Sequence, residues 1–200
     1  MIKEKRPDRR VIRTRNMLRT ALLALIAERG YDAISVADIA DRADLRRATF
    51  YLHYKDKEGL LLATLEGMFD ELVGQIEAAS GGAEGDLLAE KTAVETWRIM
   101  FAHVAAHRAL YRDLFASASA SAITRRIRGY LAGRLLKSLS GAPTGALSIP
   151  AQVLANYLAG AEVGLIQWWL ESDSAYTPEE MAVMAQRLAL DGARGALRTK

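Results

Sequence analysis

The chain has 200 residues, of which half are hydrophobic, 26% are charged and none is cysteine. This length supports one large domain or two small ones, and the lack of cysteine excludes disulfide scaffolds, thiol nucleophiles and cysteine-based metal sites. No apolar stretch reaches the roughly 18 residues that a membrane span needs, and the N-terminus does not have the pattern of a signal peptide. We therefore expect a globular, cytoplasmic protein that does not associate with membranes.

Positive charge is concentrated in the N-terminal part of the chain. Residues 1–60 carry 14 Lys and Arg against 9 Asp and Glu, whereas residues 61–200 carry 13 against 15. A basic segment on a slightly acidic body suggests a polyanionic partner for that segment alone. A solvated basic tail is the alternative, and charge by itself does not distinguish the two.

The first predicted element is an amphipathic helix over residues 14–29. Leu18, Leu22 and Leu25 recur in it at helical spacing, and Gly30 is placed to end it as a C-cap.

Two short helices follow the first one. Ser35 is expected to cap the second helix in a capping box with Asp38, and this helix ends near Ala43. The third helix is predicted over about residues 47–54.

The rest of the chain is also predicted to be helical. A long helix follows Asp56, and glycine-rich breaks occupy residues 80–85 and 140–145. The fold class is therefore all-α, with roughly nine helices. Beyond the long helix, these are predicted over about 86–107, 108–116, 120–139, 149–172 and 178–197.

The segment from Ser35 to Glu58 has the pattern of a helix-turn-helix motif, in which two short helices are joined by a tight turn. Ile39 and Ala40 are expected to face inward, and Ala48 and Phe50 are expected to fix the second of the two helices against the core. The remaining side chains suit phosphate oxygens and base edges. They are Arg46, Arg47, Thr49, Tyr51, His53, Tyr54, Lys55 and Lys57.

Residues 11–60 resemble the DNA-binding domain of the tetracycline-repressor (TetR) family of bacterial transcriptional regulators. The residues that carry the resemblance are Gly30-Tyr31, Ile39-Ala40, Ala43, Thr49-Phe50-Tyr51, His53-Tyr54 and Asp56-Lys57-Glu58. The resemblance implies an N-terminal three-helix DNA-binding domain, a divergent C-terminal ligand domain and a homodimer, in which the last two helices of each copy pair in a four-helix bundle. We accordingly place a DNA-binding domain at residues 1–55 and an effector-binding and dimerisation domain at residues 56–200.

The resemblance also implies roles for individual residues. Thr49, Tyr51 and His53 match positions that face DNA, chiefly its phosphates, and Lys57 matches a lysine that holds the DNA backbone. Ser35 matches a helix cap whose hydroxyl often touches a phosphate. The variable start of the recognition helix, where bases are expected to be read, is matched by Arg46 and Arg47. Lys55 completes the candidate DNA contacts.

The turn of the motif departs from the family pattern at two positions. Asp44 stands where the family usually has glycine, and Arg46 stands where it usually has serine. Aspartate tolerates a left-handed backbone better than most residues, so we expect the turn to form. Arg46 cannot cap the recognition helix as serine would.

The C-terminal part contains many large aromatic side chains at helical spacing. Such stripes are usually plain core, but they also line effector cavities. Glu162 interrupts an apolar helix face and either pairs with an arginine or a histidine, or anchors an effector. The candidate pocket residues are Trp97, Met100, Phe101, His103, His107, Tyr111, Phe115, Tyr130, Tyr157 and Glu162.

Two further patterns concern the same part of the chain. His103 and His107 lie four residues apart, which is compatible with a zinc site, although ordinary helix histidines are the favoured interpretation. Gly160 and Gly164 favour the close approach of another helix. The candidate dimer interface comprises Leu165, Trp169, Met181, Met184, Leu188 and Leu197, with packing inside one chain as the alternative.

Taken together, these features predict a dimeric repressor that a small-molecule effector, apolar or aromatic in the main, releases from a palindromic operator. No cofactor, metal or catalytic residue is expected. The alternatives are a helical small-molecule-binding protein or enzyme with a basic tail, and a constitutive regulator without an effector.

Overall fold

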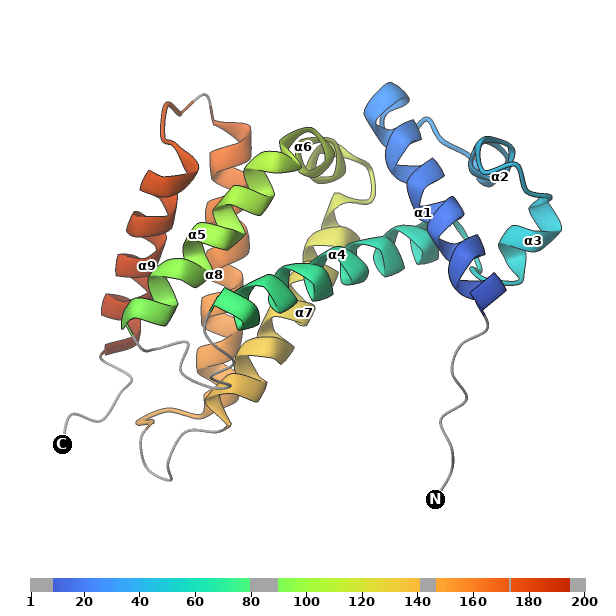
Figure 1. The fold of residues 1–200 in the computed structure, drawn as a ribbon. Helices are drawn as coiled ribbons and strands as arrows, with labels where there is room; N and C mark the ends of the chain where they lie inside the picture. Colours follow the sequence, from blue (N-terminus) through green and yellow to red (C-terminus); the bar gives the residue numbers. More distant parts are fainter. Residues whose placement is uncertain (1–8, 80–89, 141–146, 173, 195–200) are drawn as a thin grey trace, which may run out of the picture. The chain divides into compact units, whose positions relative to one another are not determined.

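The computed structural model describes residues 9–79, 90–140, 147–172 and 174–194. Within these ranges the chain forms nine helices and no strand, which confirms the predicted all-α class (Figure 1). The helices are α1 (Arg9–Arg29), α2 (Val36–Arg42), α3 (Arg47–Tyr51), α4 (Lys57–Ala79), α5 (Glu90–Ala106), α6 (Arg108–Ala116), α7 (Ala120–Leu139), α8 (Ala151–Glu171) and α9 (Pro178–Arg194).

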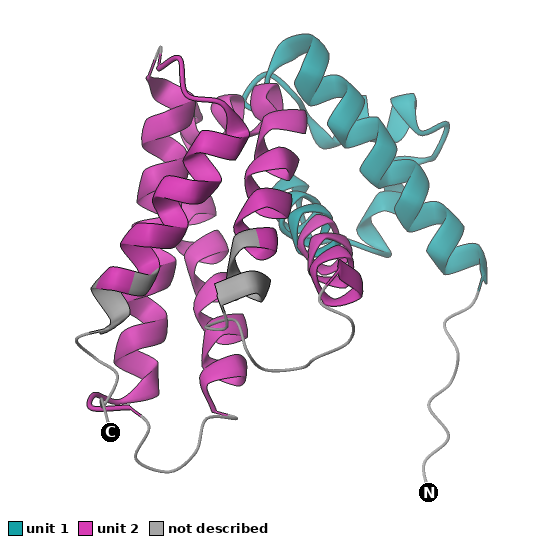
Figure 2. Ribbon diagram, turned by 60° about the vertical axis from the view of Figure 1, so that its left-hand side comes forward, with its two compact units in different colours: residues 1–67 teal, residues 68–200 magenta. Residues whose placement is uncertain are grey.

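The chain divides into two compact units, which we call the head (residues 1–67) and the C-terminal unit (residues 68–200) (Figure 2). The helix α4 runs through the division, so its first half belongs to the head and its second half to the C-terminal unit. The functional boundary predicted at residues 55/56 lies just before this helix and stays a prediction.

The head has a small apolar core made by α1 to α4. Leu18, Leu22, Ile39, Phe50 and Leu60 are completely buried in it. They come from all four helices, so each helix is fixed by at least one side chain that would otherwise be exposed to water.

The ends of the helices in the head can be compared with the predicted ones. The amide of Gly30 donates to the carbonyl of Ile26 (2.9 Å) with a φ of 76°, and this confirms the predicted end of α1. The helix α1 begins at Arg9, earlier than the predicted Thr14. The helix α3 ends at Tyr51, earlier than the predicted residue 54. The amide of His53 donates to the carbonyl of Phe50 (2.9 Å), three residues back, so the chain leaves the α-helical hydrogen-bond pattern here.

In the C-terminal unit, α7 packs along α8 and α5 packs along α9. Leu139, Leu154 and Ala155 form a buried cluster between α7 and α8. The helix α9 begins with Pro178 and carries Glu179 and Glu180 in its first turn, where acidic side chains complement the helix dipole. No helix in the described parts of the chain is long and apolar enough to span a membrane.

Candidate functional site

The start of α2 is held by the predicted capping box. The Ser35 side chain accepts from the amide of Asp38 (3.2 Å), and the Asp38 carboxylate accepts from the amide of Ser35 (2.8 Å). These hydrogen bonds with Ser35, and then the guanidinium of Arg29 (3.3 Å from Asp38), lower the pKa of Asp38 to about 2. The first helix of the motif is therefore fixed both at its own cap and to the end of α1.

The turn between α2 and α3 has the geometry of a helix-turn-helix motif. Asp44 has a φ of 54°, which confirms that it takes the left-handed position usually given to glycine. The amide of Leu45 then donates to the carbonyl of Ala40 (2.9 Å) and closes the turn. Arg46 precedes α3 without a side-chain capping bond, as predicted.

The packing of α3 depends on one side chain. Phe50 is completely buried and contacts the rings of Tyr51 (5.5 Å between centroids) and Tyr54 (6.0 Å). The prediction that Ala48 also faces the core is wrong, because Ala48 is exposed. In this helix of only five residues, Phe50 is the one fully buried side chain, Thr49 is half-buried and the other positions are exposed.

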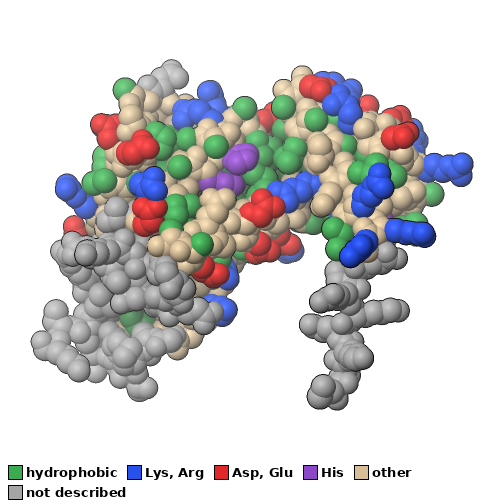
Figure 3. Space-filling model, in the orientation of Figure 1, with side chains coloured by type: hydrophobic (Ala, Val, Ile, Leu, Met, Phe, Trp, Pro, Cys, Tyr) green, Lys and Arg blue, Asp and Glu red, His purple; other side chains and the backbone are tan. Residues whose placement is uncertain are grey.

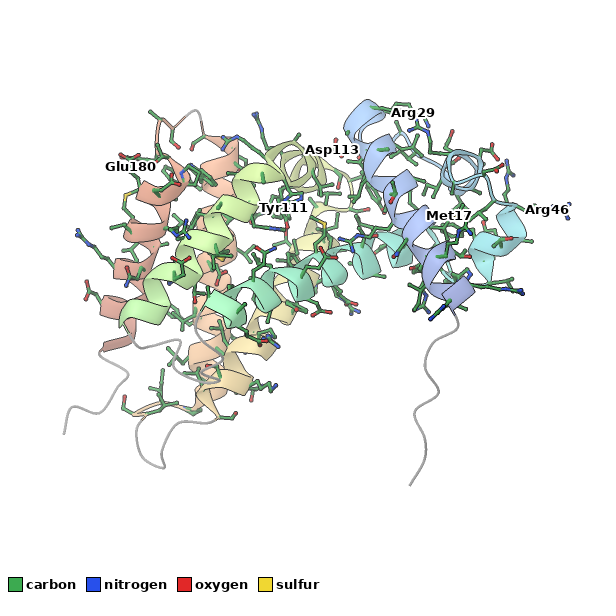
Figure 4. All side chains as sticks on the ribbon, in the orientation of Figure 1. Met17, Arg29, Arg46, Tyr111, Asp113 and Glu180 are labelled. Carbon is green, nitrogen blue, oxygen red and sulfur yellow. The ribbon has the colours of Figure 1, made fainter. Side chains whose placement is uncertain are left out.

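The outer surface of α3 and of the loop after it presents most of the predicted DNA contacts. Arg46, Arg47, Tyr51 and Lys55 are exposed, and Arg46 lies at the outer edge of the head in Figure 4. Lys and Arg side chains project from the head in Figure 3. These groups supply cationic donors and an aromatic ring on one short segment, which suits a nucleic-acid surface.

Three further predicted contacts differ in accessibility, and one exposed residue was missed. Thr49 and His53 are half-buried, whereas Ser35 is exposed. Leu52 is 83% exposed directly after α3. An apolar residue inside the motif is expected from the sequence to be core, and only the tight turn after Tyr51 places it outside.

Lys57 has a structural role in addition to the predicted one. Its ammonium group donates to the backbone carbonyls of Tyr31 (2.8 Å) and Ile34 (2.7 Å) and lies 4.2 Å from the centroid of the Tyr31 ring. Partial burial lowers the pKa of Lys57. An ammonium group has three hydrogens, so one remains for a phosphate oxygen.

The predicted pocket residues do not form a single cluster in the C-terminal unit. One group joins α5 to α8: Trp97 stacks on Phe101 (6.3 Å), whose ring meets the edge of Trp169 (5.4 Å). Met100, next to Phe101, is buried as well.

A second group joins α5 to α6. His103 shares a hydrogen bond with the Tyr111 hydroxyl (3.0 Å), and the ring of His107 lies 4.5 Å from that of His103. Burial, together with the charge of His107, lowers the pKa of His103 to about 4. Tyr111 lies between α5 and α6 in Figure 4 and stacks on Phe115 (6.3 Å). Histidine side chains reach the surface of this unit in Figure 3.

No group of three His, Cys, Asp or Glu side chains is placed to hold a metal ion among the described residues. The structure instead gives the His103 ring a tyrosine partner.

The last predicted pocket residues lie apart from these groups. Tyr130 donates to Asp70 (2.6 Å) and packs on Phe69 (5.3 Å), which joins α7 to α4. Tyr157 is 59% exposed. It therefore does not line a cavity with the others. Glu162 is buried on the inner face of α8, with 9% of its surface exposed.

The predicted dimer residues divide into buried and exposed ones. Trp169 and Met181 are 2% and 1% exposed, so both belong to the core of their own chain. Leu165 and Met184 are half-buried. Leu188 is 66% exposed, and Leu197 lies outside the described residues. Trp169 is fixed further by Arg108, whose guanidinium lies 5.2 Å from its ring.

Comparisons with known proteins agree with this architecture. The family model described as "Bacterial regulatory proteins, tetR family" matches residues 18–64, and the model described as "Transcriptional regulator C-terminal region" matches residues 92–191. The two together cover the head core, the motif and most of the C-terminal unit. The chain belongs to the TetR family of bacterial transcriptional regulators.

Curated proteins of similar sequence are regulators too. The uncharacterised HTH-type transcriptional regulator YxbF of Bacillus subtilis is 42% identical over 86 residues, which are 42% of this chain and 23% of YxbF. The chain spans between 23% and 43% of the length of the curated relatives it matches.

Solved structures match over nearly the whole chain. A TetR-family regulator from Syntrophomonas wolfei superposes with a TM-score of 0.65 at 23% identity, covering 94% of this chain and 98% of that one. Thermus thermophilus FadR, a repressor solved with lauroyl-CoA, gives a TM-score of 0.64 at 18% identity, covering 93% and 97%. At sequence identities of 23% and 18%, these similarities establish a shared fold and nothing about function.

Proposed function

We propose that the protein is a dimeric transcriptional repressor that reads a palindromic operator with α3 and releases it when an effector binds the C-terminal unit. The observation that carries the proposal is the exposure of Arg46, directly before α3, and of Arg47 and Tyr51 on α3, a helix that the buried Phe50 fixes against the core of the head. Each α3 would enter the major groove of one half-site. Arg46 and Arg47 would read bases, where arginine suits guanine.

The remaining candidates would contact the DNA backbone. Thr49, Tyr51, His53, Lys55 and Lys57 would donate to phosphates of the DNA backbone. Such contacts supply affinity without sequence information. Repression is supported by the FadR neighbour, which is a repressor, and the proposed site of action is the cytoplasm.

Dimerisation would use the outer face of α8 and the exposed positions of α9. Val153, Tyr157 and Trp168 are 56%, 59% and 48% exposed on α8, and they lie on one side of the helix because their spacing is close to whole turns. Leu188 adds an exposed apolar side chain on α9. A Cβ added at Gly164, on the same side of α8, would meet nothing within 4 Å, so a second copy of the helix can approach closely there.

Effector control would act through α4. This helix is continuous from Lys57 to Ala79 and therefore connects the residues next to the motif with those of the C-terminal unit. An effector that prefers one position of α4 would shift the population between two spacings of the heads.

Selection of bound sequences from random duplex DNA tests the proposal. We expect an enriched inverted repeat whose half-sites are about one helical turn apart, or a multiple of it. Enrichment of single half-sites would contradict the dimeric mode, and absence of any enriched sequence would contradict the proposed function.

A further inference from the structure

Glu162 is an acidic side chain in the apolar interior of the C-terminal unit. It lies on the stripe of α8 that includes Ala159, Ile166 and Trp169, all of which are buried. Among the described residues, no side chain or backbone group makes a hydrogen bond or ion pair with its carboxyl group. A carboxyl group in this position has lost most of its water without gaining a partner among the described residues.

Three basic side chains of the C-terminal unit do not pair with Glu162. Arg128 reaches α8 at Gly160, with its Cδ 4.0 Å from a Cβ added there, and Gly160 is two residues, or about 200° of helical turn, away from Glu162. Arg108 donates to the carbonyl of Trp169 (3.3 Å) at the end of α8. His103 is hydrogen-bonded to Tyr111. The expected salt bridge or histidine bond to Glu162 is therefore not formed.

The buried neighbours of Glu162 along α8 are apolar. Ala159 and Ala155 precede it by about one and two turns on the same face and are completely or almost completely buried. Trp169 follows about two turns later and meets Phe101 of α5, on which Trp97 stacks. Glu162 is thus the one acidic group on an otherwise apolar buried stripe of α8, and such a setting suits an organic group with an apolar body.

We propose that Glu162 anchors the cationic nitrogen of an amphiphilic organic amine bound inside the C-terminal unit. A protonated amine supplies the positive charge and the N–H donors that the carboxylate lacks. Burial raises the pKa of Glu162 to about 7, and a bound cation would return the group to its ionised form. This inference rests on the proposed effector response and specifies the effector's chemical class.

Naphthylmethylamine and naphthalenemethanol form a matched pair of probes, because they differ in a cationic nitrogen and a neutral hydroxyl. We expect calorimetric titration of the full chain at pH 8 to show binding of the amine at least about tenfold tighter than that of the alcohol. Glu162→Gln should remove this preference, whereas Glu162→Asp, which keeps the charge, should retain part of it. Glu171→Gln, at the exposed end of α8, should behave as the wild type.

Several results would overturn the inference. These are equal affinity of the wild type for amine and alcohol, no binding of the amine up to about 1 mM, or an unchanged amine preference in Glu162→Gln. Operator binding without probe is measured in parallel and does not involve Glu162. Its absence in the wild type refutes the proposed function, whereas intact operator binding without an amine preference refutes this inference alone.

Discussion

The ammonium group of Lys57 lies 4.2 Å from the centroid of the Tyr31 ring and donates to the backbone carbonyl of the same residue at 2.8 Å. The first turn of α4 is thereby attached to the loop between α1 and α2, which leads into the recognition motif. A residue expected from its family position to contact DNA is thus also part of the framework that holds the motif.

The first prediction concerns this framework. Lys57→Met should lower the free energy of unfolding by about 1–3 kcal/mol, because the partly buried carbonyls of Tyr31 and Ile34 lose their donor. Urea unfolding without DNA measures the change. Lys55→Met is the control, since Lys55 is exposed and should alter stability by no more than about 0.5 kcal/mol. Equal stability of the two variants would show that Lys57 acts on DNA only.

The second prediction concerns the DNA backbone. Lys55→Ala should weaken binding to all duplexes to a similar extent and reduce the slope of log affinity against log salt by about 1, because one phosphate contact is removed. Fluorescence anisotropy at several salt concentrations measures this slope. A loss confined to one sequence would contradict the phosphate role.

The third prediction compares two neighbouring tryptophans in α8. Trp168→Arg should leave the chain folded and weaken the dimer by about 2 kcal/mol or more, because Trp168 is half-exposed on the proposed interface. Trp169→Arg should unfold the C-terminal unit, since Trp169 is buried against Phe101.

Sedimentation velocity and circular dichroism distinguish these two effects. Ser121→Arg at the exposed start of α7 is the control and should remain a folded dimer. A folded dimer of Trp168→Arg would exclude this face of α8 as the interface.

The fourth prediction concerns pH. The folded-state pKa of Glu162, about 7, lies above its usual value of 4.5, so the folded chain binds the proton more tightly than the unfolded chain between these pH values. Wild-type stability should therefore be highest, relative to Glu162→Gln, below pH 4.5, and should decline as pH rises to about 7. The decline is about 1.4 kcal/mol for each pH unit in the interval between the unfolded and folded pKa values.

The quantity to measure is the difference in free energy of unfolding between the wild type and Glu162→Gln, because the titration of His103 changes stability with pH in the opposite direction. Its folded-state pKa of about 4 lies below the usual 6.5, so its contribution is present above pH 6.5 and is lost as pH falls towards 4. Both proteins contain His103, and its contribution cancels in the difference. A difference that does not vary with pH would mean that Glu162 is not buried.

The sequence was most informative where structure is determined locally. The capping box of Ser35 and Asp38, the C-cap at Gly30 and the left-handed Asp44 depend on a few adjacent residues, and the structure confirms all of them. The inward position of Phe50 was predictable too, because Phe50 is the one large side chain of this short helix that carries no polar group.

Burial on α8 could not be predicted in the same way. This helix has large apolar side chains on two sides, so periodicity alone does not show which side is the core. The sequence pattern therefore predicts Trp169, and not Trp168, at the interface, whereas the structure buries Trp169 and exposes Trp168. The missing partner of Glu162 likewise depends on where α5, α6 and α7 place their basic side chains.

The central claim is that α3 reads DNA through its exposed arginines. Its most direct test is the affinity of the wild type and of Arg47→Ala for the selected inverted repeat and for a scrambled duplex, at one salt concentration. We predict that Arg47→Ala loses about 1–3 kcal/mol on the repeat and much less on the scrambled duplex. Equal losses on both duplexes, or no loss on either, would contradict sequence reading by this helix.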